Sequence, residues 1–241
     1  MIDIKDLLYD IDLKLNKIGS NEHQNIELEN KIIALNDAQI NIIKSKFDEN
    51  NLYKMGLDSF QKRYNDLEML IENDKKLSLQ ENSLSSLNKW DADLDKLTPE
   101  YMLGIPGTEY VLADKGDCKN NVLYVNLIKH GDIQQSLGNT NTQPSFEYQE
   151  TIGTISDHKY EVYTDGTFTL KELHISYIRY PKKVDFPGYE HFDGSQSVLQ
   201  NSELPSYLKE EIVDIAVRNL AMSTENSAAV QASNTRLQND E

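Results

Sequence analysis

The chain contains a single cysteine, Cys118, among its 241 residues. One thiol cannot form an intrachain disulfide, and it cannot supply the several thiolates of a structural zinc site. We therefore expect a fold without covalent cross-links, made in a reducing compartment such as the cytosol. The surrounding residues "DKGDCKNN" are typical of an exposed polar turn, so an inert thiol is favoured over a catalytic nucleophile.

Long apolar runs are also missing. No segment approaches the roughly 20 consecutive apolar residues of a membrane-spanning helix. The first residues, "MIDIKDLLYD", lack the basic start and the unbroken apolar stretch of a secretory signal. Neither a membrane anchor nor a signal peptide is therefore expected.

Basic residues are outnumbered by acidic ones. Lys and Arg total 24 against 40 Asp and Glu, which gives a formal net charge of −16. The largest basic cluster is the short "PKK" at Pro181 to Lys183. Proteins that grip nucleic acid bind phosphates with clustered Lys and Arg, so the charge pattern argues against tight DNA or RNA binding.

Proline and glycine are scarce in the first part of the chain. All 6 prolines lie at or after Pro99, and only Gly19 and Gly56 precede residue 98. Because both residue types interrupt helices, this split predicts a helical region followed by a turn-rich region.

The first region carries apolar residues at helical spacing. One seam ends at Ile18 before Gly19 and another ends at Ile71, and each predicts a helix with one apolar face. Between them, residues 22–50 carry two stripes, which predicts a helix buried on two sides. The four sets are Ile4/Leu8/Ile11/Leu15/Ile18, Tyr53/Leu57/Phe60/Tyr64/Leu67/Ile71, Ile26/Ile33/Ile40/Phe47 and Leu28/Ile32/Leu35/Ile42.

After residue 98 the pattern changes to short β-branched and aromatic runs. These are "EYVLAD", "NVLYVNLI", "FEYQETIGTI", "HKYEVYT" and "FTLKELHISYIRY". The "TDGT" at Thr164 to Thr167 predicts a hairpin, because Asp-Gly accepts the positive φ angles of a type I′ turn. The region is expected to form antiparallel strands.

Near its end the chain returns to a helical pattern in "ELPSYLKEEIVDIAVRNLAM". Pro205 and Ser206 mark the start of the helix, and one apolar face runs along it. Glu210, Asp214 and Arg218 are expected on the opposite side. The apolar face needs a partner, and the N-terminal helices offer the nearest apolar seams.

The sequence thus predicts an α+β fold. An N-terminal antiparallel helical bundle over 1–98 is joined by a loop and C-terminal helix over 184–224. An antiparallel β-module over 99–183 is inserted between them, and residues 225–241 form a flexible tail.

Marks of catalysis or cofactor binding are not found. The sequence has no GxxxxGK[ST], GxGxxG, HExxH or CxxC pattern, so no catalytic residue, cofactor or metal site is assigned. His191 between Glu190 and Asp193 suits a metal, but a polar loop is the favoured interpretation. Trp90, among spaced leucines, is expected in the core rather than on a binding platform.

Two segments carry a resemblance to a known family. "YIRYPKKVDF" followed by "ELPSYLKEEIVDIAVRNLA" resembles the closing part of virion neck proteins of tailed bacteriophages, where an "RYP" strand end leads through a variable loop to "LP" and an "EIVDxAV" helix. The N-terminal helical segments resemble structural proteins of crAss-like phages that infect gut Bacteroidales. The resemblance covers both helical ends of the chain.

The resemblance implies a non-enzymatic subunit of the head-to-tail connector, in a virion assembled in the host bacterial cytoplasm. Such a subunit would form a homo-oligomeric, twelve-fold ring that contacts the portal protein and neighbouring neck or tail rings, with DNA only in passage during ejection. The acidic balance suits a channel that repels phosphate. The resemblance also implies subunit packing by Leu204, Pro205, Leu208, Ile212, Val213, Ala216, Val217 and Leu220.

Two other classes of function stay open at this stage. The first is a tail or baseplate module that recognises a cell-surface glycan, which predicts an exposed aromatic pocket near Tyr124, Tyr160 and Tyr163. The second is a virion-carried cell-wall hydrolase, which requires a carboxylate pair or an activated Cys118.

Overall fold

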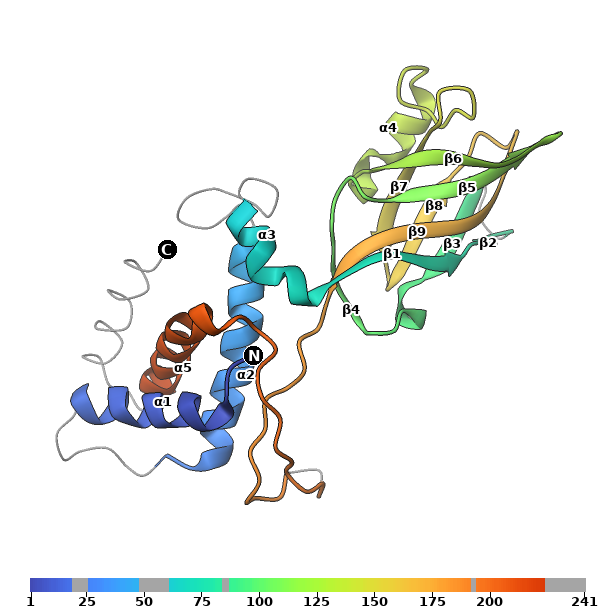
Figure 1. The fold of residues 1–241 in the computed structure, drawn as a ribbon. Helices are drawn as coiled ribbons and strands as arrows, with labels where there is room; N and C mark the ends of the chain where they lie inside the picture. The colour runs from blue at the N-terminus through green and yellow to red at the C-terminus, as the bar shows by residue number, and fades with distance from the viewer. Residues whose placement is uncertain (19–25, 48–60, 84–86, 192–193, 224–241) are drawn as a thin grey trace. The chain divides into compact units, whose positions relative to one another are not determined.

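The computed structural model describes residues 1–18, 26–47, 61–83, 87–191 and 194–223 (Figure 1). The chain divides into two compact units. Met1–Met69 together with Pro181–Glu241 forms one, here called the helical unit, and Leu70–Tyr180 forms the other, the sheet unit. The helical unit is therefore built from both ends of the sequence.

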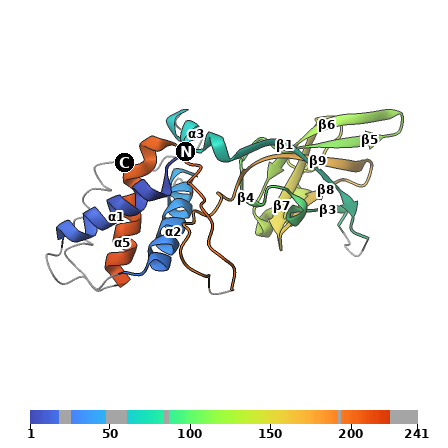
Figure 2. The same cartoon turned by 60° about the horizontal axis from the view of Figure 1, so that its bottom comes forward.

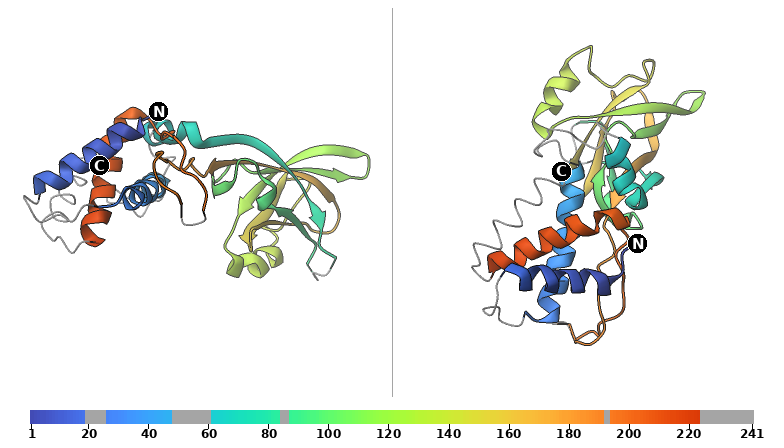
Figure 3. Two further views of the ribbon diagram at one scale, coloured as in Figure 1. Left: turned by 90° about the horizontal axis from the view of Figure 1, so that it is seen from below. Right: turned by 60° about the vertical axis from the view of Figure 1, so that its left-hand side comes forward.

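The helical unit contains α1 (Ile4–Ile18), α2 (Leu28–Phe47), α3 (Gln61–Leu67) and α5 (Lys209–Ser223), with 3₁₀ turns η2 (Glu68–Leu70) and η5 (Ser206–Leu208). α5 packs against both α1 and α2. The axis of α1 crosses that of α2 steeply (Figures 1 and 3). The core between these helices is aliphatic and includes Ile4, Leu7, Ile11, Ile32, Leu35, Ile42, Ile212, Val213 and Val217.

The segment before α5 is fastened to the start of the chain. Ile2 and Ser202 exchange two backbone hydrogen bonds of 3.1 Å, and the Ile4 N–H donates to Asn201 Oδ1. The buried Ser202 hydroxyl donates to Gln39 Oε1 of α2 at 2.7 Å. These bonds satisfy polar groups that would otherwise be buried without partners, and they fix where α5 begins.

The sheet unit is one curled, nine-stranded mixed sheet (Figure 2). Its order is β1-β9-β5-β6-β7-β8-β3-β2, and β4 also pairs with β9. The strands are β1 (Ile71–Ser78), β2 (Gln80–Glu81), β3 (Lys89–Asp93), β4 (Tyr101–Gly104), β5 (Tyr110–Lys115), β6 (Cys118–Leu127), β7 (Glu150–Ser156), β8 (Lys159–Tyr163) and β9 (Thr169–Arg179). All pairs are antiparallel except β6 with β7, which are parallel.

Alternate residues of the strands fill the core of the sheet unit. Val111 and Leu123 are fully buried, whereas their neighbours along β5 and β6 are half-buried or exposed. β9 is buried more continuously, from Leu173 to Ile175. Gly153 lies where the packing is closest: a Cβ atom there would lie 2.7 Å from Val125 Cγ1 and 2.8 Å from Tyr160 Cε1. Glycine is required at this position because any side chain would displace its neighbours.

The fold class expected from the sequence is wrong in three respects. Residues 71–93 form β1, β2 and β3, so the sheet begins well before residue 99 and the N-terminal region is not a bundle over 1–98. The helices cross rather than lie antiparallel. The sheet is mixed, because η4 (His130–Asp132) and α4 (Ile133–Gly138) lie between two parallel strands.

The predicted strands agree with the structure better than the third predicted helix. All five β-branched runs contain strands. The helix expected to reach Ile71 ends at Leu67, and Tyr53, Leu57 and Phe60 lie outside the described residues. The tail from residue 225 is likewise outside them.

The prediction of a hairpin at "TDGT" is also wrong. β8 and β9, on either side of it, do not pair with each other, and only Gly166 has a positive φ there. The type I′ geometry occurs instead between β7 and β8, at Asp157 (φ 49) and His158 (φ 58).

Candidate functional site

The eight residues expected to pack between subunits lie at the start of α5 and along it. Seven are buried within the single chain and Pro205 is half-buried. The seven are Leu204, Leu208, Ile212, Val213, Ala216, Val217 and Leu220. Their side chains are covered within one chain, where α5 packs against α1 and α2.

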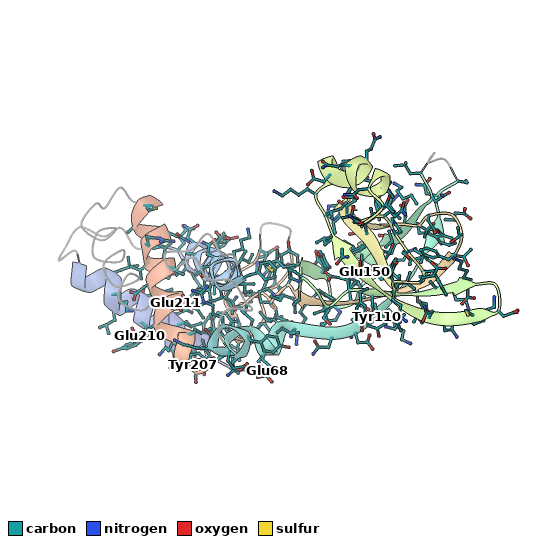
Figure 4. All side chains as sticks on the ribbon, turned by 90° about the horizontal axis from the view of Figure 1, so that it is seen from above. Glu68, Tyr110, Glu150, Tyr207, Glu210 and Glu211 are labelled. Carbon is teal, nitrogen blue, oxygen red and sulfur yellow. The ribbon has the colours of Figure 1, made fainter. Side chains whose placement is uncertain are left out.

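Ion pairs fasten α5 on both sides. Lys14 of α1 lies 2.9 Å from Asp214 and 3.0 Å from Glu210, and Lys46 of α2 lies 3.0 Å from Glu211. Figure 4 labels Glu210 and Glu211 on α5. Glu210 is exposed, but Asp214 and Glu211 are buried. The expectation that Asp214 lies on the solvent side is therefore wrong.

A further pair joins α1 to the start of α5. Asp10 lies 2.7 Å from the Lys209 ammonium, and this hydrogen bond raises the pKa of Lys209. Tyr207, two residues earlier, donates to the buried Asp66 at 2.7 Å. The start of α5 is thus held by α1 and by the end of α3.

One carboxylate organises the described parts of the loop between β9 and α5, residues 185–191 and 194–200. The buried Asp185 accepts hydrogen bonds from the N–H of Val198 (2.7 Å) and from the Tyr189 hydroxyl (2.8 Å), and it lies 3.1 Å from His191 Nε2. Burial alone would raise the pKa of Asp185, but these hydrogen bonds together lower it. The side-chain amide of Asn36 on α2 donates to the Val184 carbonyl at 3.1 Å and accepts from the Val184 N–H at 2.8 Å.

This braced loop exposes two adjacent aliphatic side chains. Val198 is 60% exposed and Leu199 is 57% exposed. Asp185 holds the backbone of Val198 directly, and Gln200 pairs with Asp185 through two backbone bonds. An exposed apolar edge whose backbone is held by part-buried hydrogen bonds is suited to contact another protein surface.

α2 presents a second apolar surface. Ile26, Ile33, Ile40 and Phe47 recur every seventh residue, and the other stripe expected on this helix, containing Ile32, forms its core face. Ile33 is 51% exposed, and the other three are half-buried. The expectation that α2 is buried on two sides is therefore only half met within one chain.

The outer face of the sheet unit carries a polar cluster. Asp74 Oδ1 accepts from the Tyr110 hydroxyl and from His174 Nδ1, each at 2.7 Å, and the Tyr110 and His174 rings stack at 4.4 Å. Glu172 lies 3.6 Å from His174 Nε2. The hydrogen bonds from Tyr110 and then His174 lower the pKa of Asp74. Asp74 sits at φ 51 within an irregularity of β1, so the cluster fastens this bulge to β5 and β9.

The aromatic pocket expected for glycan binding is not formed by its three tyrosines. Tyr124 is 62% exposed, but Tyr160 and Tyr163 are each only 2% exposed. Tyr163 donates to Glu161, and both lie within the fold. Two of the three tyrosines expected to contact a glycan are therefore buried and cannot form an exposed pocket.

The residues that the sequence offered for metal binding, catalysis or ligand stacking lie in separate places. His191 bonds Asp185, and Asp193 lies outside the described residues. Within the described ranges, no group of three His, Cys, Asp or Glu side chains is arranged to hold a metal ion. Cys118 is exposed at the start of β6, and Trp90 on β3 packs partly buried against the sheet core. No described helix is long and apolar enough to cross a membrane.

A buried acid in the sheet core was not anticipated. Glu109 is 3% exposed and Tyr160 is 2% exposed, and in the described part of the chain Glu109 Oε2 and the Tyr160 hydroxyl have no hydrogen-bond partner. Burial raises the pKa of Glu109, although the N–H groups of Gly107, Thr108 and Glu109 itself oppose the rise. No sequence pattern distinguishes Glu109 from the other acidic residues.

Glu109→Gln is expected to stabilise the sheet unit by about 1 kcal/mol near pH 7. A carboxyl with a raised folded pKa favours the folded state at low pH, and that contribution is lost as pH rises from the ordinary value near 4.5 through the raised one. The gain over the parent should therefore shrink toward acid pH. Urea unfolding followed by Trp90 fluorescence across this pH range measures it, with exposed Glu150→Gln as the control. A variant less stable than the parent at every pH would contradict the assignment.

No protein-family model matches the chain, and no curated protein matches its sequence. The functional assignment therefore depends on the residues, their geometry and the resemblance of the terminal segments.

Proposed function

We propose that the protein is a non-enzymatic virion structural protein, a ring subunit of the head-to-tail connector of a crAss-like tailed bacteriophage. The ring would join the portal to the tail and form part of the DNA channel. Its partners would be further copies of itself, the portal protein and the neighbouring neck or tail rings.

The observation that carries the proposal is the braced loop over residues 185–200. It occupies the place of the variable loop between "RYP" and "LP" in the resemblance. Arg179 ends β9, Pro181 begins the return to the helical unit, and Leu204–Pro205 precede α5. Val198 and Leu199 form the only adjacent pair of strongly exposed aliphatic residues in the described ranges.

Ring formation requires a heterologous contact, in which one patch meets a different patch on the next copy. A loop that projects Val198 and Leu199 supplies one such patch. The net charge of −16 supports passage of DNA without retention, since a negative wall repels phosphate.

The test is the mass of the purified full-length protein, measured by light scattering on a sizing column, alone and after mixing with a portal protein of the same phage. We expect a closed ring when the portal is present. Leu199→Asp should prevent ring formation, because it places a charge in an apolar contact. Leu127→Asp, at a 44% exposed leucine on β6, is the control and should leave the ring intact.

Two results would count against the proposal in different ways. A chain whose mass is unchanged by the portal would contradict the connector assignment. A ring that forms equally well from Leu199→Asp would keep the connector assignment and exclude the loop as the contact.

A further inference from the structure

The apolar stripe on α2, formed by Ile33, Ile40 and Phe47 at every seventh position, is only partly covered within the described part of the chain. α2 has 20 residues and is therefore about 30 Å long. Its inward face, with Leu35, Ile42 and Ile43 fully buried, completes the core of the helical unit. The stripe lies on the other side, and an apolar residue at every seventh position is the pattern by which one helix packs along another.

The charges beside the stripe are separated along the helix. Glu29 lies in its first turn and is half-buried, whereas Asp37 near its middle and Lys44 near its end are exposed. The other two lysines of α2, Lys31 and Lys46, already pair with carboxylates of their own chain. Two copies of α2 packed in parallel would bring each charged residue close to its own counterpart, which is unfavourable.

An antiparallel pair has a register that matches both the apolar residues and the terminal charges. With a two-fold axis between residues 36 and 37, Ile33 lies opposite Ile40 of the second copy. Ile26 precedes α2, which begins at Leu28, so the helical register does not extend to it. The same register places Glu29 opposite Lys44 of the second copy. Ile33 and Ile40 are then covered, and opposite charges meet at both ends.

We propose that two copies of this chain dock through α2, antiparallel about this axis. The contact is isologous, so it closes at two copies and does not build a ring. It is independent of the proposed connector role and describes the protein before it meets other virion proteins. One helix from each copy buries less area than a standard stable interface, so the dimer is weak and reversible.

Asp37 sits beside the axis and near Asp37 of the second copy. This like-charge contact weakens the dimer, and Asp37→Asn should tighten it several-fold. The effect distinguishes this register from a slipped antiparallel one, because slippage would move the two Asp37 side chains apart along the helix pair.

Disulfide trapping tests the direction and register in the full-length chain with Cys118→Ser as background. When Ile33→Cys and Ile40→Cys chains are mixed, we expect a cross-linked dimer under mild oxidation. Ile33→Cys alone should give none, because seven residues, or about 10 Å, separate the two thiol positions along the helix pair. A parallel pair would instead bring the two copies of residue 33 together. Cross-linking of Ile33→Cys with itself, or no cross-linking in the mixture, would overturn the proposal.

Sedimentation equilibrium without the portal supplies the second measurement. The mass should rise with concentration toward two chains, and Ile33→Asp should weaken the association at least tenfold while leaving the circular dichroism spectrum unchanged. Leu13→Asp, at a 39% exposed leucine on α1, is the matched control and should leave association unchanged. A monomer at every concentration, or an Ile33→Asp chain that loses its fold, would show that the stripe is covered within one chain and would also overturn the proposal.

Discussion

Ile212→Ala is expected to lower the free energy of unfolding of the helical unit by about 3 kcal/mol. Ile212 is fully buried on α5, where that helix packs against α1 and α2. Truncation removes apolar burial and leaves a cavity that rigid neighbours fill only in part. Urea unfolding followed by the helical circular dichroism signal measures the loss.

Ile33→Ala provides the control for the same change of residue. Ile33 is 51% exposed on α2, so in dilute solution its truncation should alter the free energy of unfolding by less than about 0.5 kcal/mol. If Ile212→Ala were as mild as Ile33→Ala and instead changed only the mass of an assembly, α5 would be a subunit interface, and its packing within one chain would be wrong.

The contrast between these two positions separates folding from assembly. The regular apolar face of α5, with Ile212, Val213 and Ala216, was expected to pack on the N-terminal helices, and the resemblance implied subunit packing by the same residues. The first expectation is confirmed, because α5 packs against α1 and α2 of its own chain. The exposed apolar positions include Ile33, on the second stripe of α2, and Leu199 in a loop. Strong helical periodicity identifies a buried face but does not reveal which chain buries it.

Local sequence patterns predicted which helices and strands occur better than where they end or which strands pair. The run ending in Tyr64 and Leu67 continues at helical spacing to Ile71, and the sequence alone gives no reason to stop. In the structure Ile71 pairs with Ile178 on β9, a partner more than a hundred residues away. Such a long-range strand pairing overrides a local helical preference, and no single window of sequence contains it.

The position of the type I′ turn was mispredicted for a similar reason. Asp165-Gly166 is the stronger type I′ signal, yet Asp157-His158 adopts that turn, because β8 pairs with β7 and β3 rather than with β9. The order of strands is set by the whole sheet, including the parallel pairing of β6 with β7. The role of Asp185 in its loop could not be predicted from the sequence either. Its partners Tyr189, His191 and Val198 form no recognised motif.

Lys14→Met is expected to cost the helical unit about 3 kcal/mol, the second large effect. Lys14 places its ammonium 2.9 Å from Asp214, whose side chain is only 2% exposed, and 3.0 Å from Glu210. Methionine keeps most of the apolar stem but removes the charge. Two carboxylates one turn apart on α5 then face each other without this cation, and one of them is buried.

Lys31→Met is the matched control for this prediction. Lys31 and Lys14 are each 14% exposed and each contacts a carboxylate, but Asp12, the partner of Lys31, is 49% exposed. Water can solvate Asp12 once Lys31 is gone, so the expected loss is below about 1 kcal/mol. The comparison isolates the burial of the carboxylate as the cause.

The double variant Lys14→Met/Asp214→Asn completes the test. If the cost of Lys14→Met arises from removing the cation beside a buried carboxylate, neutralising Asp214 should recover most of it in urea unfolding. If the double variant is as unstable as the sum of the two single ones, the cost arises from lost packing around the lysine stem instead. The charge of Asp214 would then contribute nothing to holding α5 against α1.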